Sequence, residues 1–238
     1  MQNQYTGDIG DYGKYGLLRC LQNTGIPIGI NWYLTPDENN GDGRYISYLE
    51  RGLYRNCDEH LWIELKEIIR VRRSVEEIEK RKIIDADYYS EVLDFSGMNP
   101  SQREKRRAAW HRAALEKLYN SGIVFLDPDN GIMVPSAEKT RRSNKFIELH
   151  ELRDYYDQGK SIIYYQHKAR KKDEVYRNSF CILLRDQFPD ASGLALKFKT
   201  TSLRYYFLIL QPAHAGIIRD CVQNEFLPRW WEHFIIIS

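Results

Sequence analysis

Short apolar runs and longer segments with helical spacing alternate along the second half of the chain. The short runs, each bounded by turn residues, predict strands at 123–126, 161–165, 194–199 and 204–210. A capping box at Ser101-Gln-Arg-Glu104 and the stop signal Gly122 predict a helix at 101–121, and further helices are predicted at 144–158, which ends before Gly159, at 171–187 and at 213–226. Strands that alternate with helices favour a parallel sheet, whereas two strands in close succession favour an antiparallel hairpin. We therefore predict an α/β fold, a Rossmann-like three-layer sandwich with a mostly parallel sheet and an antiparallel terminal hairpin.

The first half of the chain extends this picture without adding a second domain. A helix at 11–22 and a strand at 28–34 are followed by a charged segment, 58–80, with apolar residues at helical spacing. A chain of 238 residues suits one large domain. We expect residues 1–238 to form a single domain with a helical insertion within 50–110.

Composition excludes a membrane protein and argues for a reducing compartment. The sequence has no run of about 18 apolar residues, and its first residues are polar, so we expect a cytoplasmic protein without a membrane partner. The four cysteines, Cys20, Cys57, Cys181 and Cys221, form no C-x-x-C pair. We expect reduced, mostly buried thiols.

Positive charge is local rather than global. The net charge is only +2, but basic residues gather in dense clusters at Arg70–Arg73, Arg103–Arg107, Lys139–Lys145 and Lys168–Lys172. Two of these clusters follow predicted strands, at the edge where α/β sheets bind ligands. Such clusters suit phosphate groups, which favours a nucleic-acid or nucleotide partner, although solvated helix and loop faces would give the same pattern.

The most informative segment is Gly122–Gly131, in which an apolar strand ends in two carboxylates. Asp127 and Asp129 follow the strand directly, and Pro128, Asn130 and Gly131 make the connection a tight loop. His167 follows the next predicted strand and should lie at the same edge of the sheet. Asp127, Asp129 and His167 are therefore the candidate catalytic residues.

Two stretches resemble known methyltransferases. The order of elements and the sequence Asp127-Pro-Asp-Asn130 resemble the second half of class I S-adenosylmethionine-dependent methyltransferases and their motif after the fourth strand. The opening Gly7-Asp-Ile-Gly-Asp-Tyr-Gly-Lys-Tyr15 is similar to the start of a ribosomal-RNA adenine methyltransferase family. The resemblance implies S-adenosylmethionine as cofactor, Asp11 and Lys14 close to it, and Asp127 as acceptor of a hydrogen bond from an exocyclic amine.

The loop after the first predicted strand is a second candidate for the functional edge. It is polar and carries Asp37, which we add to Asp11 and Lys14 as a cofactor-binding residue. The lead hypothesis is thus a divergent methyltransferase that acts on nucleic acid or nucleotides. Its site should gather Asp8, Asp11, Lys14, Asp127, Asp129 and His167.

Two alternatives stay open. Asp127 and Asp129 offer hard oxygen ligands for magnesium or manganese, and His167 could activate water, as in a metal-dependent phosphoester hydrolase or nuclease. The second carboxylate at position 129 and the lack of a G-x-G-x-G loop after the first strand favour this hypothesis. The other alternative is a non-catalytic nucleic-acid-binding or partner module, a Rossmann-like domain that has lost its cofactor. Independently of both, Asp-Pro-Asp-Asn-Gly is also ordinary turn chemistry, in which an Asp caps its own loop.

Overall fold

The computed structural model describes residues 1–38, 41, 43–52, 54–169, 171–200 and 203–237. Some positions of the segments discussed above lie outside this range. They are Asn39, Asn40 and Asp42 of the predicted polar loop, Arg170 of the fourth basic cluster, and Thr201 and Ser202 between the last two long strands.

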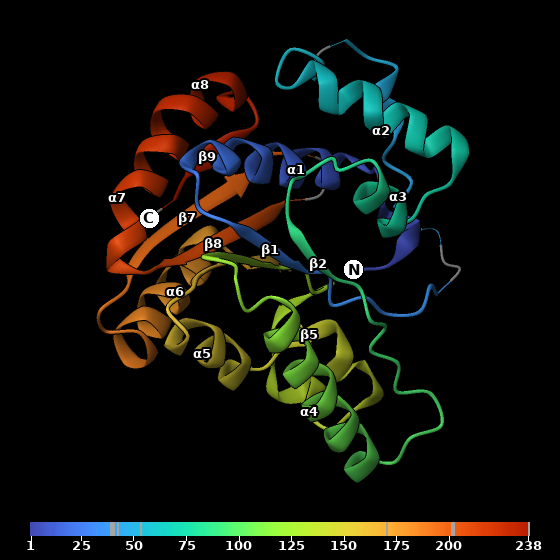
Figure 1. Ribbon diagram of the computed structural model, residues 1–238, viewed down its shortest axis with the longest axis vertical. Helices are drawn as coiled ribbons and strands as arrows, with labels where there is room; N and C mark the ends of the chain where they lie inside the picture. Colours follow the sequence, from blue (N-terminus) through green and yellow to red (C-terminus); the bar gives the residue numbers. More distant parts are fainter. Residues whose placement is uncertain (39–40, 42, 53, 170, 201–202, 238) are drawn as a thin grey trace.

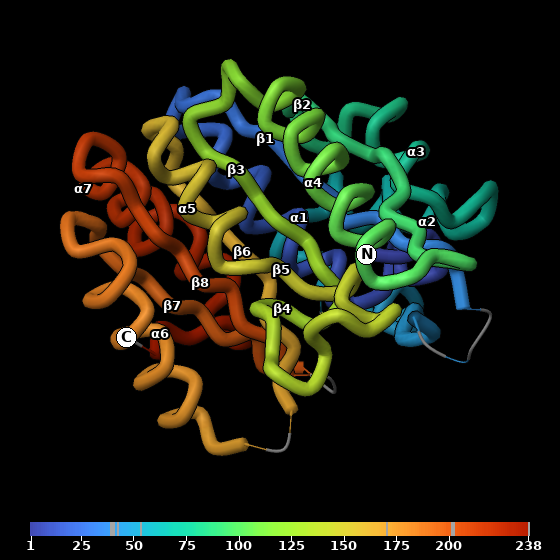
Figure 2. Tube along the Cα trace, turned by 90° about the horizontal axis from the view of Figure 1, so that it is seen from below, coloured from blue at the N-terminus to red at the C-terminus, as the bar shows by residue number. Residues whose placement is uncertain are grey.

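A seven-stranded sheet in the order β2-β1-β3-β6-β8-β7-β9 forms the centre of the molecule. Its strands are β1 (Ile28–Asn31), β2 (Asp87–Tyr89), β3 (Ile123–Leu126), β6 (Ser161–His167), β7 (Ser192–Phe198), β8 (Arg204–Leu210) and β9 (Phe234–Ile236). The first four in this order are parallel, and β8, β7 and β9 add three antiparallel pairings. Strand β8 lies between β6 and β7, as Figure 2 shows.

Helices cover both faces of the sheet, which confirms the predicted Rossmann-like α/β sandwich (Figure 1). One face packs against α1 (Ile9–Leu21), α2 (Glu59–Val71), α3 (Val75–Lys80), α7 (Pro212–Cys221) and α8 (Leu227–Trp230). The other packs against α4 (Pro100–Lys117), α5 (Leu149–Asp157) and α6 (Asp173–Gln187). Residues of one strand alternate between the two cores, as the pleat of a strand requires: Ile123 and Phe125 face the first, and Val124 and Leu126 the second.

Helix α1 comes unusually close to its neighbours because glycines replace larger residues on its inner side. A Cβ atom on Gly13 would lie 2.7 Å from the ring of Phe198, and one on Gly16 would lie 2.2 Å from Trp230. Both distances are shorter than atoms tolerate, so only glycine permits this packing. The close approach brings the start of α1 against the carboxyl edge of the sheet.

Several element boundaries differ from the predictions. The predicted strand 28–34 ends at Asn31, because the chain turns at Tyr33, whose φ is +45°. The predicted helix 58–80 is two helices, since Arg72 is extended and Ser74 caps α3. These helices and α4 begin within the range in which we expected an insertion, and α2 and α3 lie between β1 and β2.

The sequence pattern did not predict the shortest strands. Strand β2 has only three residues, and β4 (Gly131–Ile132) pairs with β5 (Phe146–Ile147) in a separate two-stranded sheet. The predicted helix 144–158 therefore begins only at Leu149. Within the described part of the chain, no helix is long and apolar enough to cross a membrane.

Candidate functional site

A cavity of about 490 Å³ opens at the carboxyl edge of the parallel strands. The start of α1, the loop after β3, the end of β6 and the start of β8 form its wall. Strand β8 contributes its first residue because it runs antiparallel to β6, so that Arg204 lies opposite His167. The site therefore lies where α/β sheets generally bind their ligands.

The centre of the cavity wall is a buried ion-pair network around Lys14. The Lys14 Nζ atom lies 2.7 Å from Asp11 Oδ1 and 2.5 Å from Asp127 Oδ2. Asp11 also accepts hydrogen bonds from the backbone N–H of Gly7 and the hydroxyl of Tyr15. All three charged side chains are almost fully buried. One helix residue thus joins two carboxylates that are far apart in the sequence.

Burial and crowding change the proton affinities in this network. Burial, together with the negative charges of Asp8 and Asp127, raises the pKa of Asp11 to about 6, although Lys14 opposes the shift. Burial alone would lower the pKa of Lys14, but Asp11 and Asp127 outweigh it and raise that pKa. Lys14 therefore stays charged, while Asp11 can exchange a proton near neutral pH.

A second buried ion pair joins α1 to β8. Asp8 caps α1, because its Oδ1 accepts a hydrogen bond from the backbone N–H of Asp11, and its Oδ2 accepts one from Arg204 Nη2 at 3.0 Å. The Arg204 guanidinium lies against Gly10, where a Cβ atom would come within 1.6 Å of Nη1. This Nη1 is buried and has no hydrogen-bond acceptor among the described residues. The absence of a side chain at position 10 thus makes room for the guanidinium.

The Asp129 carboxylate has a different set of partners from the Asp127 carboxylate. Its carboxylate lies 2.8 Å from the amino group of Met1 and 3.5 Å from Lys145 Nζ, and it accepts a hydrogen bond from Gln2. Burial raises the pKa of Asp129, but the Met1 amino group and Lys145 outweigh it, so the pKa is lowered. Asp129 is therefore an anion that pairs with the Met1 amino group and Lys145 rather than with Lys14.

The structure brings together all but one of the predicted site residues. Asp8, Asp11, Lys14, Asp127, Asp129 and His167 all line the cavity. His167 is exposed, and its Nδ1 atom lies 3.3 Å from the hydroxyl oxygen of Tyr165. Asp37 does not line the cavity; it accepts a hydrogen bond from the backbone N–H of Gln4, and its neighbour Glu38 lines the cavity and pairs with Lys145.

Other lining residues were not predicted as site residues. Arg142 and Lys145 belong to the third basic cluster of the sequence, which was the only signal for them. Arg204 and Tyr206 are two positions apart on β8 and so share a face of the strand. Tyr206 also donates a hydrogen bond to the carbonyl of Gly10. The sequence left open that Arg204, at the start of the last long strand, reaches this edge, but its contacts with Asp8 and Gly10 depend on the position of β8 in the sheet.

The turn after β1 is filled by protein side chains. Trp32 and Tyr33 are fully buried on opposite sides of the sheet, where they donate hydrogen bonds to Glu79 and Glu151. This turn contains no glycine, as the sequence indicated. At this edge, space for a small molecule is therefore found in the cavity beside α1 rather than between the side chains of the β1 turn.

The two carboxylates of the β3 loop do not converge on one point. Asp127 is directed to Lys14 and Asp129 to the Met1 amino group. Among the described residues, no three metal-ligating side chains of the cavity bring their ligand atoms within 4.8 Å of one another. A divalent ion here would have to displace the existing cations.

No model of a known protein family matches the sequence, and no curated protein matches it either.

Proposed function

We propose that this chain is a divergent S-adenosylmethionine-dependent methyltransferase that acts on an amine of a nucleic acid or nucleotide. One observation carries the proposal. The two stretches that resemble methyltransferases are separated by 113 residues, yet they meet in the contact between Lys14 and Asp127. A chance resemblance in two unrelated segments would give no reason for this meeting.

The cavity suits the cofactor in size and charge. Its volume of about 490 Å³ lies within the range of small-molecule sites. S-adenosylmethionine carries positive charge on its sulfonium and amino groups and negative charge on its carboxylate. The cavity wall carries both signs of charge in its ion pairs, Asp8 with Arg204 and Lys14 with Asp11 and Asp127, so it can face both the cations and the anion of the cofactor. The β1 turn does not fit an adenosyl group, so the fit rests on the cavity alone.

The residues at the edge can orient an amine and remove its proton. The bound cofactor would supply an electrophilic methyl group. Asp127 accepts a hydrogen bond from the amine, which directs the nitrogen lone pair, and Lys14 fixes the carboxylate in place. Asp11, with a pKa of about 6, can take up the proton that the methylated amine releases. Burial raises the pKa of Tyr165 to about 12, so its phenol stays protonated as a hydrogen-bond donor.

Metal-dependent phosphoester hydrolysis is the second candidate. Four carboxylates, Asp8, Asp11, Asp127 and Asp129, line one cavity with His167, and methyl transfer does not require so many. In this hypothesis Asp127 and Asp129 bind magnesium or manganese and His167 activates water. The pairing of these carboxylates with protein cations places this candidate second.

Calorimetric titration of the metal-stripped protein distinguishes the candidates. We expect S-adenosylmethionine to bind with micromolar affinity, and Lys14→Ala to weaken binding at least tenfold, whereas exposed Lys105→Ala leaves it unchanged. Absence of cofactor binding contradicts the methyltransferase proposal. Magnesium or manganese binding that is lost in Asp127→Asn but kept in Asp157→Asn would then favour the hydrolase. If neither ligand binds, a non-catalytic nucleic-acid-binding module becomes the better account.

A further inference from the structure

Two cysteines lie side by side near the end of α1 that is remote from the cavity. The Sγ atoms of Cys20, on α1, and Cys221, at the end of α7, are 3.4 Å apart although 201 residues separate them. Cys221 is buried and Cys20 is half-buried. Cys181, in contrast, is exposed. The cysteine spacing in the sequence gave no sign of this pair.

A carboxylate completes the cluster. Glu225 belongs to a π-helical segment, Val222–Phe226, that directly continues α7. Its carboxylate oxygen and the two sulfur atoms all lie within 4.8 Å of one another. Asn23 donates a hydrogen bond of 2.8 Å to Glu225 Oε2, which orients the carboxylate from outside the cluster. π-Helical segments are rare and often occur at functional sites.

We propose that Cys20, Cys221 and Glu225 form a site for a thiophilic divalent metal ion of the zinc class. Two thiolates and one carboxylate are ligands that zinc accepts in tetrahedral geometry. With Zn–S bonds of about 2.3 Å, tetrahedral geometry separates two sulfur atoms by about 3.8 Å. The observed 3.4 Å is close to this value and far above the roughly 2.05 Å of a disulfide bond.

The surroundings leave room for a fourth ligand. A second cavity of about 310 Å³ adjoins the cluster and is lined by Cys20 and Glu225, together with Arg19 and Asp58. The Arg19 guanidinium is engaged by Asp58, with Nε 2.7 Å from Oδ2. Three protein ligands with an open fourth position allow a water molecule or an external ligand to bind the ion. Uptake of the metal by the two thiols and the carboxylate releases two protons to solvent.

Cobalt is a suitable probe, because thiolate ligation gives it an intense near-ultraviolet charge-transfer band. We expect the reduced protein, kept free of oxygen, to bind one Co²⁺ per chain with this band and with the visible bands of tetrahedral cobalt. An equivalent of Zn²⁺ should abolish both. Cys20→Ser and Cys221→Ser should each remove the charge-transfer intensity, whereas Cys181→Ser retains it. Glu225→Gln should weaken binding about tenfold or more, and exposed Glu116→Gln should not.

A measurement on the unaltered chain covers the case in which a variant fails to fold. Zn²⁺ should protect Cys20 and Cys221, but not Cys181, from alkylation by N-ethylmaleimide, as located by peptide mass analysis. Absence of the cobalt band in the wild type, or equal alkylation of these cysteines with and without Zn²⁺, overturns the proposal. So does oxidation of the pair to a disulfide in a protein whose reduced form binds no metal.

Discussion

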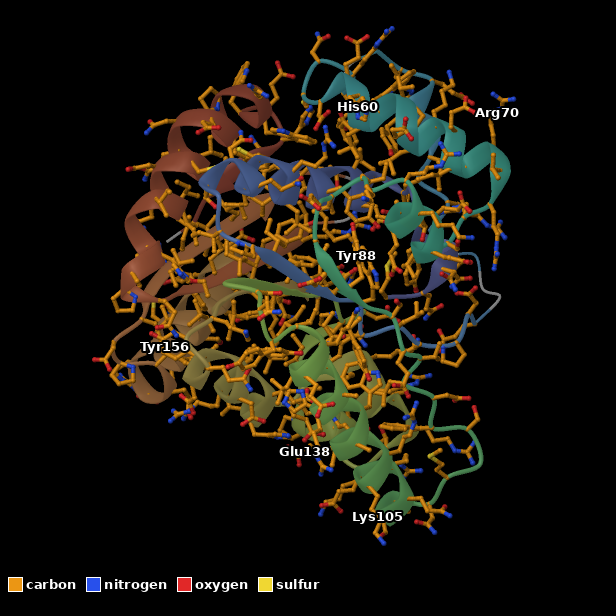
Figure 3. The ribbon with its side chains drawn as sticks, in the orientation of Figure 1. His60, Arg70, Tyr88, Lys105, Glu138 and Tyr156 are labelled. Atoms are coloured by element: carbon orange, nitrogen blue, oxygen red, sulfur yellow. The ribbon has the colours of Figure 1, made fainter. Side chains whose placement is uncertain are left out.

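At the scale of single residues, Lys14 holds two buried carboxylates that would otherwise repel each other. We expect Lys14→Met to lower the free energy of unfolding by about 3–5 kcal/mol, because it leaves Asp11 and Asp127 buried without a cation. Lys105, which projects from the outer end of α4 in Figure 3, provides the control. Lys105→Met should change the free energy of unfolding by less than about 0.5 kcal/mol. Urea denaturation measures both. Adding Asp11→Asn to Lys14→Met should recover part of the loss; no recovery would contradict the carboxylate repulsion.

The raised pKa of Asp11 makes stability depend on pH. Its pKa is about 6 in the folded protein against the usual 3.8, so the folded state keeps a proton that the unfolded chain releases between these values. The resulting stabilisation is complete below 3.8 and is lost as the pH rises through about 6. The unfolding free energy of wild type relative to Asp11→Asn should therefore fall between about pH 4 and pH 7, by at most about 1.4 kcal/mol per pH unit. For exposed Asp157→Asn we expect the difference from wild type to stay constant over this pH range. A constant difference for Asp11→Asn as well would argue against a raised pKa of Asp11.

Residue patterns revealed part of this site. The sequence placed Asp127 and Asp129 at a strand end, and the structure confirms that position. It could not show that Lys14 joins Asp127 to Asp11, because that contact depends on the packing of α1 against the sheet. Nor could it separate Glu38, which lines the cavity, from Asp37, which does not, since both follow the same strand.

At the scale of elements, the glycines of α1 decide how closely this helix approaches the sheet. We expect Gly10→Ala to displace Arg204 from Asp8 and to lower the unfolding free energy by about 1–3 kcal/mol, because the added methyl group overlaps the guanidinium. Gly216, in α7, has open space around it, so Gly216→Ala should instead stabilise the protein by about 0.5–1 kcal/mol. Thermal and urea unfolding of both variants test the contrast. Equal effects would mean that helix propensity alone governs both positions.

Long, strongly patterned elements were predictable from the sequence, and short ones were not. Strand 123–126 was predicted with its observed bounds because four apolar residues meet turn residues on both sides. Strand β2 has only three residues, two of them not fully buried, so its pattern resembles a loop. The break between α2 and α3 lies at extended Arg72 and at Ser74, whose S-x-x-E spacing to Glu77 is a helix-start signal that the prediction of one helix over 58–80 did not use.

At the scale of the whole molecule, the net charge of +2 provides little general attraction for nucleic acid. Affinity must then come from local cations such as Arg142, which lines the cavity. If the proposed function holds, Arg142→Ala should weaken binding of a single-stranded oligonucleotide and reduce the slope of log K against log salt by about 0.7. Exposed Arg112→Ala on α4, outside the cavity lining, should leave the slope unchanged in fluorescence-anisotropy titrations. Equal slopes for all three proteins would place the phosphate contacts elsewhere.

The place of β8 in the sheet also has a consequence for synthesis on the ribosome. This strand is the last long one in the sequence, yet it fills the gap between β6 and β7. Until residues 204–210 have left the exit tunnel, β6 and β7 have no strand between them, and both carry open edges. Arg204 arrives with the same strand, so Asp8 stays without its guanidinium partner during this interval. The nascent chain therefore joins β6 to β7 and closes the cavity wall in one late step, before β9 adds the last strand, and premature termination before β8 would leave two aggregation-prone edges exposed.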